Sequence, residues 1–284
     1  MNVNYEAEYD NRARVPEFPV ILARWQSESI AYREETTHAG RAELNVRYGK
    51  TDRQILDLFL PKAGAAAPLA LFFHGGYWRA LAPATFSQMA RGLNARGVAV
   101  AVVGYDLCPE VSIADIVVQA RQACIYLWRR FGRRVMVYGH SAGGHLAACL
   151  LATDWKKLSP DMPEDFLPTA YSISGLFDLK PMMHVAMNED FRLDDKEATR
   201  VSPLTWTPPK GRVLDAVVGA LESSEFLRQS REIADVWGRT GVTTRYEAIA
   251  DANHFTVLDP LTDPNSAMVE RLMKLVGQAN SIKA

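Results

Sequence analysis

Residues 133–151 have the sequence RRVMVYGHSAGGHLAACLL, in which an apolar run predicts a buried strand and a run of small residues predicts a helix. Between the two stand residues 139–143, Gly-His-Ser-Ala-Gly, a G-x-S-x-G pattern. In a strand–turn–helix context this turn is so sharp that glycines must flank the serine, whose hydroxyl then projects from the carboxyl end of the strand. Ser141 is therefore the candidate nucleophile. The alternative is a glycine-rich turn that only packs tightly.

Strands and helices alternate along the rest of the chain. Apolar or β-branched runs predict eight strands, and helical patterns separate the later ones. We therefore expect an α/β fold with one eight-stranded, mostly parallel sheet and helices on both faces. The first two strands have no helix between them and should pair antiparallel at one edge. The predicted strands are 43–48, 54–60, 69–73, 98–103, 134–138, 169–174, 213–218 and 243–249, and the predicted helices are 84–96, 112–131, 142–153, 224–238 and 265–278.

The layout indicates one domain. Eight strands fit a single sheet, so residues 1–284 are expected to form one α/β domain. Two stretches without a predicted strand, 1–40 and 175–211, should form a small covering segment over the carboxyl end of the sheet. The helix over 112–131 has clear limits, with Ser112 as its N-cap and Gly132 just beyond its end.

Composition and charge argue against several classes of partner. The chain is 23% charged with a net charge of −1, which gives no reason to expect nucleic acid as a partner. Its longest apolar runs, LALFF at 69–73 and VAVAVV at 98–103, are too short to span a bilayer. The opening residues 1–14, MNVNYEAEYDNRAR, lack the apolar core of a signal peptide. We therefore expect a cytoplasmic location and no membrane partner.

The chain lacks the common patterns for metals and cofactors. Three widely spaced cysteines, Cys108, Cys124 and Cys149, match neither a zinc site nor a disulfide framework. No HExxH, phosphate loop or dinucleotide fingerprint is present. We expect neither a metal nor a cofactor, and a small molecule as the substrate. Whether the chain forms a homodimer stays open.

A serine hydroxyl needs a base to remove its proton, and histidine is the usual partner. The chain has six histidines. His140 precedes Ser141 in the turn, His145 lies one helical turn beyond it, and His74 belongs to a glycine loop; two more fall in the expected covering segments. His254 follows the last predicted strand and precedes the last helix, where it completes the order serine, acid, histidine. His254 is therefore the candidate base, and an ordinary loop histidine is the alternative.

A carboxylate must hold that imidazole in the right tautomer. It should follow the seventh strand, where Glu222 stands four residues beyond 218. Asp178, after the sixth strand, is the rival. Glu225 is expected in the first turn of the next helix, where a carboxylate complements the helix dipole, and Asp251 in a turn.

A second glycine loop provides candidate oxyanion donors. Residues 69–80, LALFFHGGYWRA, predict a buried strand that ends in two glycines. Gly75 and Gly76 let the backbone approach a substrate closely, so that their N–H groups, with that of Ala142, can hold a negative oxygen. His74 is expected to brace this loop rather than to transfer protons.

HGGYW at 74–78, together with GHSAGG at 139–144, resembles the kynurenine formamidases (arylformamidases) of the esterase/lipase-type α/β-hydrolases. EYDNRARVPEFPVILARW at 8–25 and VVGALESSEFLRQSRE at 217–232 are also similar to segments of that family. The resemblance implies the α/β-hydrolase fold. At the matching positions it implies Ser141 as nucleophile, His254 as base and Glu222 as acid, where the family more often has Asp. The oxyanion donors would come from Gly75, Gly76 and Ala142.

The same resemblance implies a reaction. The enzyme would cleave an N-formyl arylamide such as N-formylkynurenine to the arylamine and formate, through a formyl-serine intermediate, as in tryptophan catabolism. Tyr77, Trp78 and Phe177 are candidates for an apolar wall around the aromatic group. Two other functions stay open: a short-chain carboxylesterase or thioesterase with the same triad, and a hydrolase-fold binding protein that has lost activity.

Overall fold

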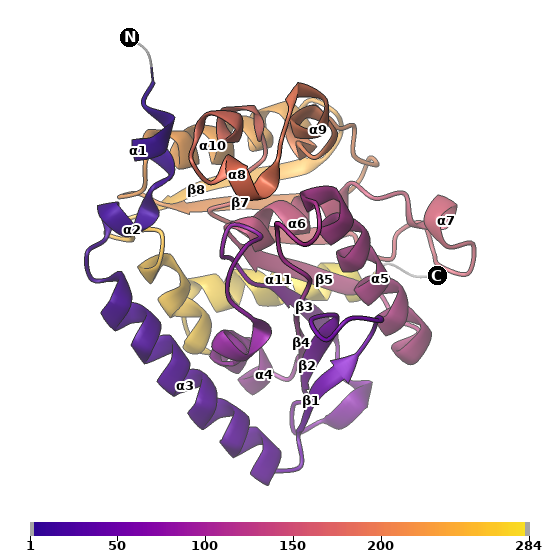
Figure 1. Cartoon of the computed structure of the whole chain (residues 1–284). Coiled ribbons are helices and arrows are strands. Elements are labelled where there is room, and N and C mark those ends of the chain that lie inside the picture. Colours follow the sequence, from indigo (N-terminus) through magenta and orange to yellow (C-terminus); the bar gives the residue numbers. More distant parts are fainter. Residues whose placement is uncertain (1–2, 282–284) are drawn as a thin grey trace.

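A computed structural model describes residues 3–281, with all eight strands in one twisted sheet (Figure 1). The strand order is β1-β2-β4-β3-β5-β6-β7-β8. β1 and β2 pair antiparallel, as do β2 and β4, and the other neighbours are parallel. The eight-stranded, mostly parallel sheet with an antiparallel edge is therefore confirmed. The strands are β1 (Ala42–Arg47), β2 (Ile55–Phe59), β3 (Leu69–Phe73), β4 (Ala99–Val103), β5 (Val135–His140), β6 (Thr169–Ile173), β7 (Val213–Gly219) and β8 (Thr243–Ile249).

Helices cover both faces of the sheet. Neighbouring residues of β3 point to opposite faces, so Leu71 and Phe73 join one apolar cluster and Phe72 joins another. The first cluster includes α5, α6 and α10, and the second includes α3, α4 and α11. The helices are α1 (Tyr5–Tyr9), α2 (Asn11–Arg14), α3 (Phe18–His38), α4 (Arg91–Ala95), α5 (Ile113–Phe131), α6 (Ala142–Leu151), α7 (Trp155–Leu158), α8 (Asn188–Phe191), α9 (Asp195–Arg200), α10 (Ser224–Gly238) and α11 (Ala267–Ser281), with 3-10 turns η1 (Gly64–Ala66), η2 (Pro83–Thr85), η3 (Ser87–Ala90), η4 (Lys180–His184), η5 (Pro203–Thr205) and η6 (Thr256–Thr262).

Helix α5 begins and ends where the sequence predicts. The Ser112 hydroxyl accepts the N–H of Asp115, and the Asp115 carboxylate accepts the N–H of Ser112, which completes a capping box. Gly132 ends the helix with φ of 59°, a conformation that glycine adopts at little cost. The limits of α5 are thus set by local side chains.

The helix predicted over 84–96 is wrong, because the structure divides this stretch into η2, η3 and α4. The N–H of Ser87 donates to the hydroxyl of Ser29 on α3 instead of continuing a helical ladder. Phe86 bonds back to Pro83, and Met89 to Phe86, in the tighter i−3 pattern of a 3-10 turn.

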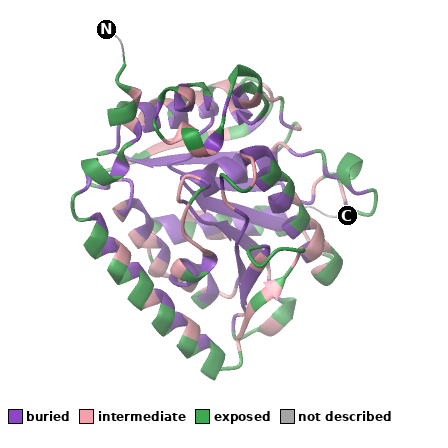
Figure 2. Ribbon diagram, viewed as in Figure 1, coloured by how far each residue is buried: buried purple, intermediate pink, exposed green. Residues whose placement is uncertain are grey.

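Helix α3 lies in a region where no element was predicted. Its buried residues recur every three or four positions, which defines one helix face. Figure 1 shows α3 running down the outside of the molecule, away from α1 and α2, and Figure 2 shows that its outer side is exposed and that the central strands are buried. Most of α3 therefore packs along the side of the sheet, and only Phe18 and Trp25, near its start, line the cavity described below. The buried residues of α3 are Phe18, Ile21, Trp25, Ser29, Tyr32 and Thr36.

Candidate active site

Ser141 occupies the sharp turn between β5 and α6. Its φ is 55° and its ψ −117°, a strained conformation for a residue with a side chain. A Cβ on Gly139 would collide with the carbonyl of Gly143, and one on Gly143 with the carbonyl of Phe73. Only glycine fits at both positions, which explains the spacing in the sequence. The Ser141 N–H donates to the carbonyl of Ile173 (2.8 Å), which ties the turn to β6.

His254 and Glu222 meet at the carboxyl end of the sheet. His254 lies between β8 and η6, and its Nδ1 is 2.6 Å from Oε2 of Glu222, in the loop after β7. The other oxygen, Oε1, accepts the Ser174 hydroxyl (2.6 Å) and the N–H of Gly219 (2.7 Å). An ionised carboxylate only accepts hydrogen bonds, so Nδ1 of His254 carries a proton and Nε2 is left able to take one.

The other acidic candidates lie elsewhere. Asp178 accepts the N–H of Lys180 (3.2 Å) and lies 3.6 Å from Arg228. Glu225 accepts the Tyr9 hydroxyl and pairs with Arg228, both at 2.8 Å. Of the carboxylates considered, Glu222 is the one that contacts His254.

The glycine loop after β3 lies against Ser141. A Cβ on Gly75 would come within 2.9 Å of Nδ1 of His140 and 3.1 Å of Cβ of Ser141. Gly76 has φ of 114°, which favours glycine. Among residues 3–281, the amides of Gly76 and Ala142 donate to no acceptor. Two unused N–H groups next to a candidate nucleophile suit a developing negative charge.

His74 and His140 form hydrogen bonds to the backbone of the loops that surround Ser141. The Nδ1 of His74 donates to the carbonyl of Gly75 (2.7 Å), and its ring stacks between Tyr105 and Phe86. His140 donates from Nε2 to the carbonyl of His254 (2.7 Å). Burial lowers the pKa of His74 to about 4, and burial, together with the neighbouring His254 ring, holds the pKa of His140 well below its usual range. Both rings are therefore neutral supports.

A cavity of about 400 Å³ opens above these residues. Ser141, His254, Gly75, Gly76 and Tyr77 all line it. Its apolar walls are the aromatic rings of Phe18, Trp25, Phe86 and Phe255.

Two of the aromatic residues predicted for the wall lie in the core instead. Trp78 is fully buried and packs edge-on against His145 and Phe191. Phe177 is also fully buried, and its N–H bonds Gln229 (2.6 Å). The walls come from α3 and the loops around η2, η3 and η6, which the sequence did not single out.

Several residues near the site were missed. Ser174 has φ of 53° and orients the Glu222 carboxylate, but its sequence context gives no signal for this. The N-terminal residues that line the cavity were expected only as general cover. Of the stretch 175–211, the cavity lining includes only Met187. The residues of this N-terminal group are Glu6, Tyr9, Asp10, Asn11 and Arg12.

Three further observations bear on the predictions about cysteines, metals and membranes. Cys108, Cys124 and Cys149 are buried and free. Within residues 3–281, no group of three or more His, Cys, Asp or Glu side chains is placed to hold a metal ion. In the same range, no helix combines the length and apolar character needed to cross a bilayer.

Comparisons with known proteins agree with this geometry. Residues 70–282 match a family model described as the alpha/beta hydrolase fold. The chain is 32% identical to a kynurenine formamidase from Salmo salar over 89% of this chain and 90% of that protein, and 30% identical to one from Danio rerio over 83% and 82%. A predicted thioesterase of known structure from Silicibacter sp. tm1040 superposes with a TM-score of 0.85, at 32% identity, over 95% of this chain and 98% of that one. The expected fold is thus confirmed, and the chain belongs to the α/β-hydrolase family, in the group that contains the kynurenine formamidases.

Proposed function

We propose that this enzyme hydrolyses N-formyl arylamides, such as N-formylkynurenine, to the arylamine and formate. Ser141 is the nucleophile, His254 the base and Glu222 the acid of its triad. The observation that carries the proposal is the 2.6 Å contact between Glu222 and His254 beside a cavity that Ser141 also lines. The kynurenine formamidases of similar sequence support the choice of substrate.

The reaction proceeds through a covalent intermediate. The Ser141 hydroxyl attacks the formyl carbon while His254 Nε2 takes its proton. N–H groups of Gly75, Gly76 and Ala142 stabilise the negative oxygen of the tetrahedral intermediate. His254 then gives the proton to the nitrogen of the arylamine as the C–N bond breaks. Water, activated by His254, cleaves the formyl-serine and releases formate.

The buried carboxylate makes this proton transfer effective. Glu222 accepts a hydrogen bond from the Nδ1–H of His254 and stabilises the imidazolium that forms in each step. Hydrogen bonds from Ser174 and Gly219 keep the carboxylate in place. The aromatic walls formed by Trp25, Phe86 and their neighbours suit the aryl group of the substrate.

The test is a comparison of substrates. The ratio of kcat/KM for N-formylkynurenine to that for p-nitrophenyl acetate should favour the formamide, and Ser141→Ala should abolish both activities while retaining the native circular dichroism spectrum. A ratio strongly in favour of the ester would overturn the proposed substrate. Undiminished turnover by Ser141→Ala would overturn the nucleophile.

A carboxylesterase or thioesterase is the second candidate. It is favoured by the likeness to the predicted thioesterase, whose TM-score is 0.85. The triad and the glycine loop after β3, which contains Gly75 and Gly76 and is called the oxyanion loop below, would perform both reactions. The ratio of the two kcat/KM values therefore decides between the candidates. The kynurenine formamidases of similar sequence and the contact between Glu222 and His254 argue against a catalytically inactive binding protein, so a fluorophosphonate probe should react at Ser141.

We also propose that residues 1–284 form one domain and that the enzyme is cytoplasmic. Eight strands in one sheet support the first statement, and three free cysteines support the second. Fractionation of the native cells tests the location. Size-exclusion chromatography with light scattering decides whether the enzyme is a monomer or a homodimer.

A further inference from the structure

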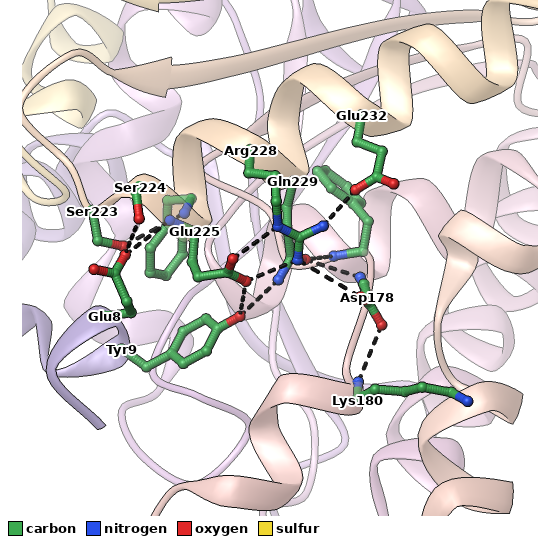
Figure 3. A network of polar contacts seen from close by, with 12 residues as sticks. Glu8, Tyr9, Asp178, Lys180, Ser223, Ser224, Glu225, Arg228, Gln229 and Glu232 are labelled. Carbon is green, nitrogen blue, oxygen red and sulfur yellow. Dashed lines mark hydrogen bonds and ion pairs between the residues drawn. The ribbon is translucent and has the colours of Figure 1, made fainter. Parts of the chain in front are cut away.

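Polar contacts fix an N-terminal cap, residues 5–14, against helix α10. The Tyr9 hydroxyl donates to Glu225 (2.8 Å) and accepts from Nε2 of Gln229 (2.8 Å), as Figure 3 shows. Glu8 accepts the hydroxyl of Ser224 (2.7 Å) and the N–H of Glu225 (3.0 Å) at the start of the same helix. Since Glu222 lies two residues before the start of α10, one end of the cap is anchored close to the triad.

A second set of contacts fixes the cap to the oxyanion loop. The Tyr77 hydroxyl donates to the carbonyl of Tyr9 (2.7 Å) and accepts from Nδ2 of Asn11 (3.0 Å). Glu6 accepts the N–H of Ala186 (2.7 Å). The cap is held at three places, so side chains that project from it toward the cavity have a defined position.

Four charged side chains line the cavity, three of them from the cap. Arg79 is paired with Asp190 at 2.9 Å, and Glu6 accepts the N–H of Ala186. Asp10 accepts the N–H of Ala13 with one oxygen and caps α2. Within residues 3–281, Arg12 makes no ion pair or side-chain hydrogen bond. The four side chains are Glu6, Asp10, Arg12 and Arg79.

The position of Arg12 suits recognition of a substrate. Its guanidinium carbon lies 4.9 Å from the ring centre of Phe18, which itself lines the cavity. Stacking on an aromatic face holds a guanidinium in place without using its N–H donors. Those donors match the two oxygens of a carboxylate.

We infer that Arg12 binds the carboxylate of an α-amino-acid head group on the substrate, whose aryl group lies against the aromatic walls. The inference rests on the proposed function and narrows it to N-formyl arylamines that carry an amino acid. Asp10 and Glu6, which line the same cavity as Arg12, disfavour a substrate that carries negative charge alone. A head group with both charges places its ammonium near these carboxylates and its carboxylate on Arg12.

The test compares two formamides that differ by one carboxylate. N-formylkynurenine carries it, and N-formylkynuramine lacks it. Arg12→Gln should raise KM for N-formylkynurenine by about fivefold to tenfold with little change in kcat, as expected for a partly solvated, charge-assisted hydrogen bond. For N-formylkynuramine, KM should change by less than about twofold.

A matched control comes from the same helix. Arg14 pairs with Glu8 at 3.3 Å outside the cavity lining, so Arg14→Gln removes the same charge and should leave the ratio of the two KM values unchanged. If Arg12→Gln raises KM equally for both substrates, or for neither, the inference about Arg12 is overturned and the proposed function still stands. If the wild-type enzyme hydrolyses neither formamide, the proposed function fails and the inference fails with it.

Discussion

Glu222 and Glu225 lie on either side of the start of α10, and both are buried, yet they serve different regions of the molecule. Glu222 faces the strand ends and contacts His254, Ser174 and the backbone of Gly219. Glu225 faces the N-terminal cap and contacts Tyr9 and Arg228. One short segment therefore joins the region that performs the chemistry to the region that we propose selects the substrate.

The two environments differ in charge. Glu222 faces a histidine and neutral donors, so it can stabilise an imidazolium as it forms. Glu225 already has a full positive charge beside it: burial alone would raise its pKa, but the hydrogen bonds from Arg228 and Tyr9 outweigh burial, and the net pKa is lowered. Of these two buried carboxylates, only Glu222 has no permanent cation beside it. It is therefore the one suited to stabilise a positive charge that forms during catalysis.

The largest effect should come from Glu222→Gln. An amide cannot stabilise the imidazolium and permits the wrong tautomer of His254, so we expect kcat to fall by about 10³- to 10⁴-fold. Glu225→Gln, the equivalent change on the cap side, should lower kcat by less than about tenfold. Steady-state kinetics on purified variants with native thermal melts provide the measurement.

Asp178→Asn is the control for that pair of variants. It removes a carboxylate that lies near Arg228 and does not contact His254. Near-normal kcat is expected, whereas a loss as large as that of Glu222→Gln would mean that the acid has been assigned wrongly.

A substitution in the oxyanion loop should lower activity almost as much. In Gly75→Ala the new methyl group would press on His140 and Ser141, at 2.9 and 3.1 Å, and displace the loop. We expect kcat/KM to fall by about 10²-fold, as for the loss of an oxyanion donor. Gly277→Ala is the control, since a Cβ there has no neighbour within 4 Å. Equal activities of the two variants would show that the loop does not contribute to catalysis.

The region that performs the chemistry could be predicted from the sequence better than the N-terminal cap. Strand ends converge in a parallel sheet, so Ser141, Glu222 and His254 could be selected from local patterns far apart in the sequence. The contact of Tyr9 with Glu225 spans 216 positions and involves no local motif, so nothing in the sequence indicates it.

Two features that were not predicted correctly from the sequence have simpler physical causes. Helix α3 does have helical spacing, but Ser29 and Thr36 occupy buried positions on its inner face and interrupt the apolar pattern. Tyr77 and Trp78 are adjacent aromatic residues in a loop where both have positive φ. The alternation of strands does not apply there, so the sequence could not tell that Tyr77 lines the cavity and Trp78 enters the core.

A smaller effect should appear in the pH dependence of stability. Burial lowers the pKa of His74 and His145 to about 4, against an ordinary value of about 6.5. Between these values the unfolded chain binds more protons, so the free energy of unfolding should fall as the pH drops, by up to about 1.4 kcal/mol per pH unit for each histidine. The pKa of Glu225 is lowered, so its ion pair with Arg228 should persist over most of this range.

Urea unfolding at several pH values between 7 and 4.5 measures this slope. His145→Gln should reduce it, because one buried titrating ring is removed. The matched change at the exposed His184, His184→Gln, should leave the slope unchanged. A slope that is equally steep in His145→Gln and in the wild type would contradict the assignment.

The smallest effect should separate the cap from the chemistry. Tyr9→Phe removes the hydroxyl that joins Glu225 and Gln229, which should lower the free energy of unfolding by about 1 kcal/mol and raise KM severalfold with kcat nearly unchanged. Tyr5→Phe is the matched control, because within residues 3–281 the Tyr5 hydroxyl makes no hydrogen bond, and it should behave as the wild type. A fall in kcat rather than a rise in KM in Tyr9→Phe would mean that the cap positions the triad through α10, and the two regions would then act as one.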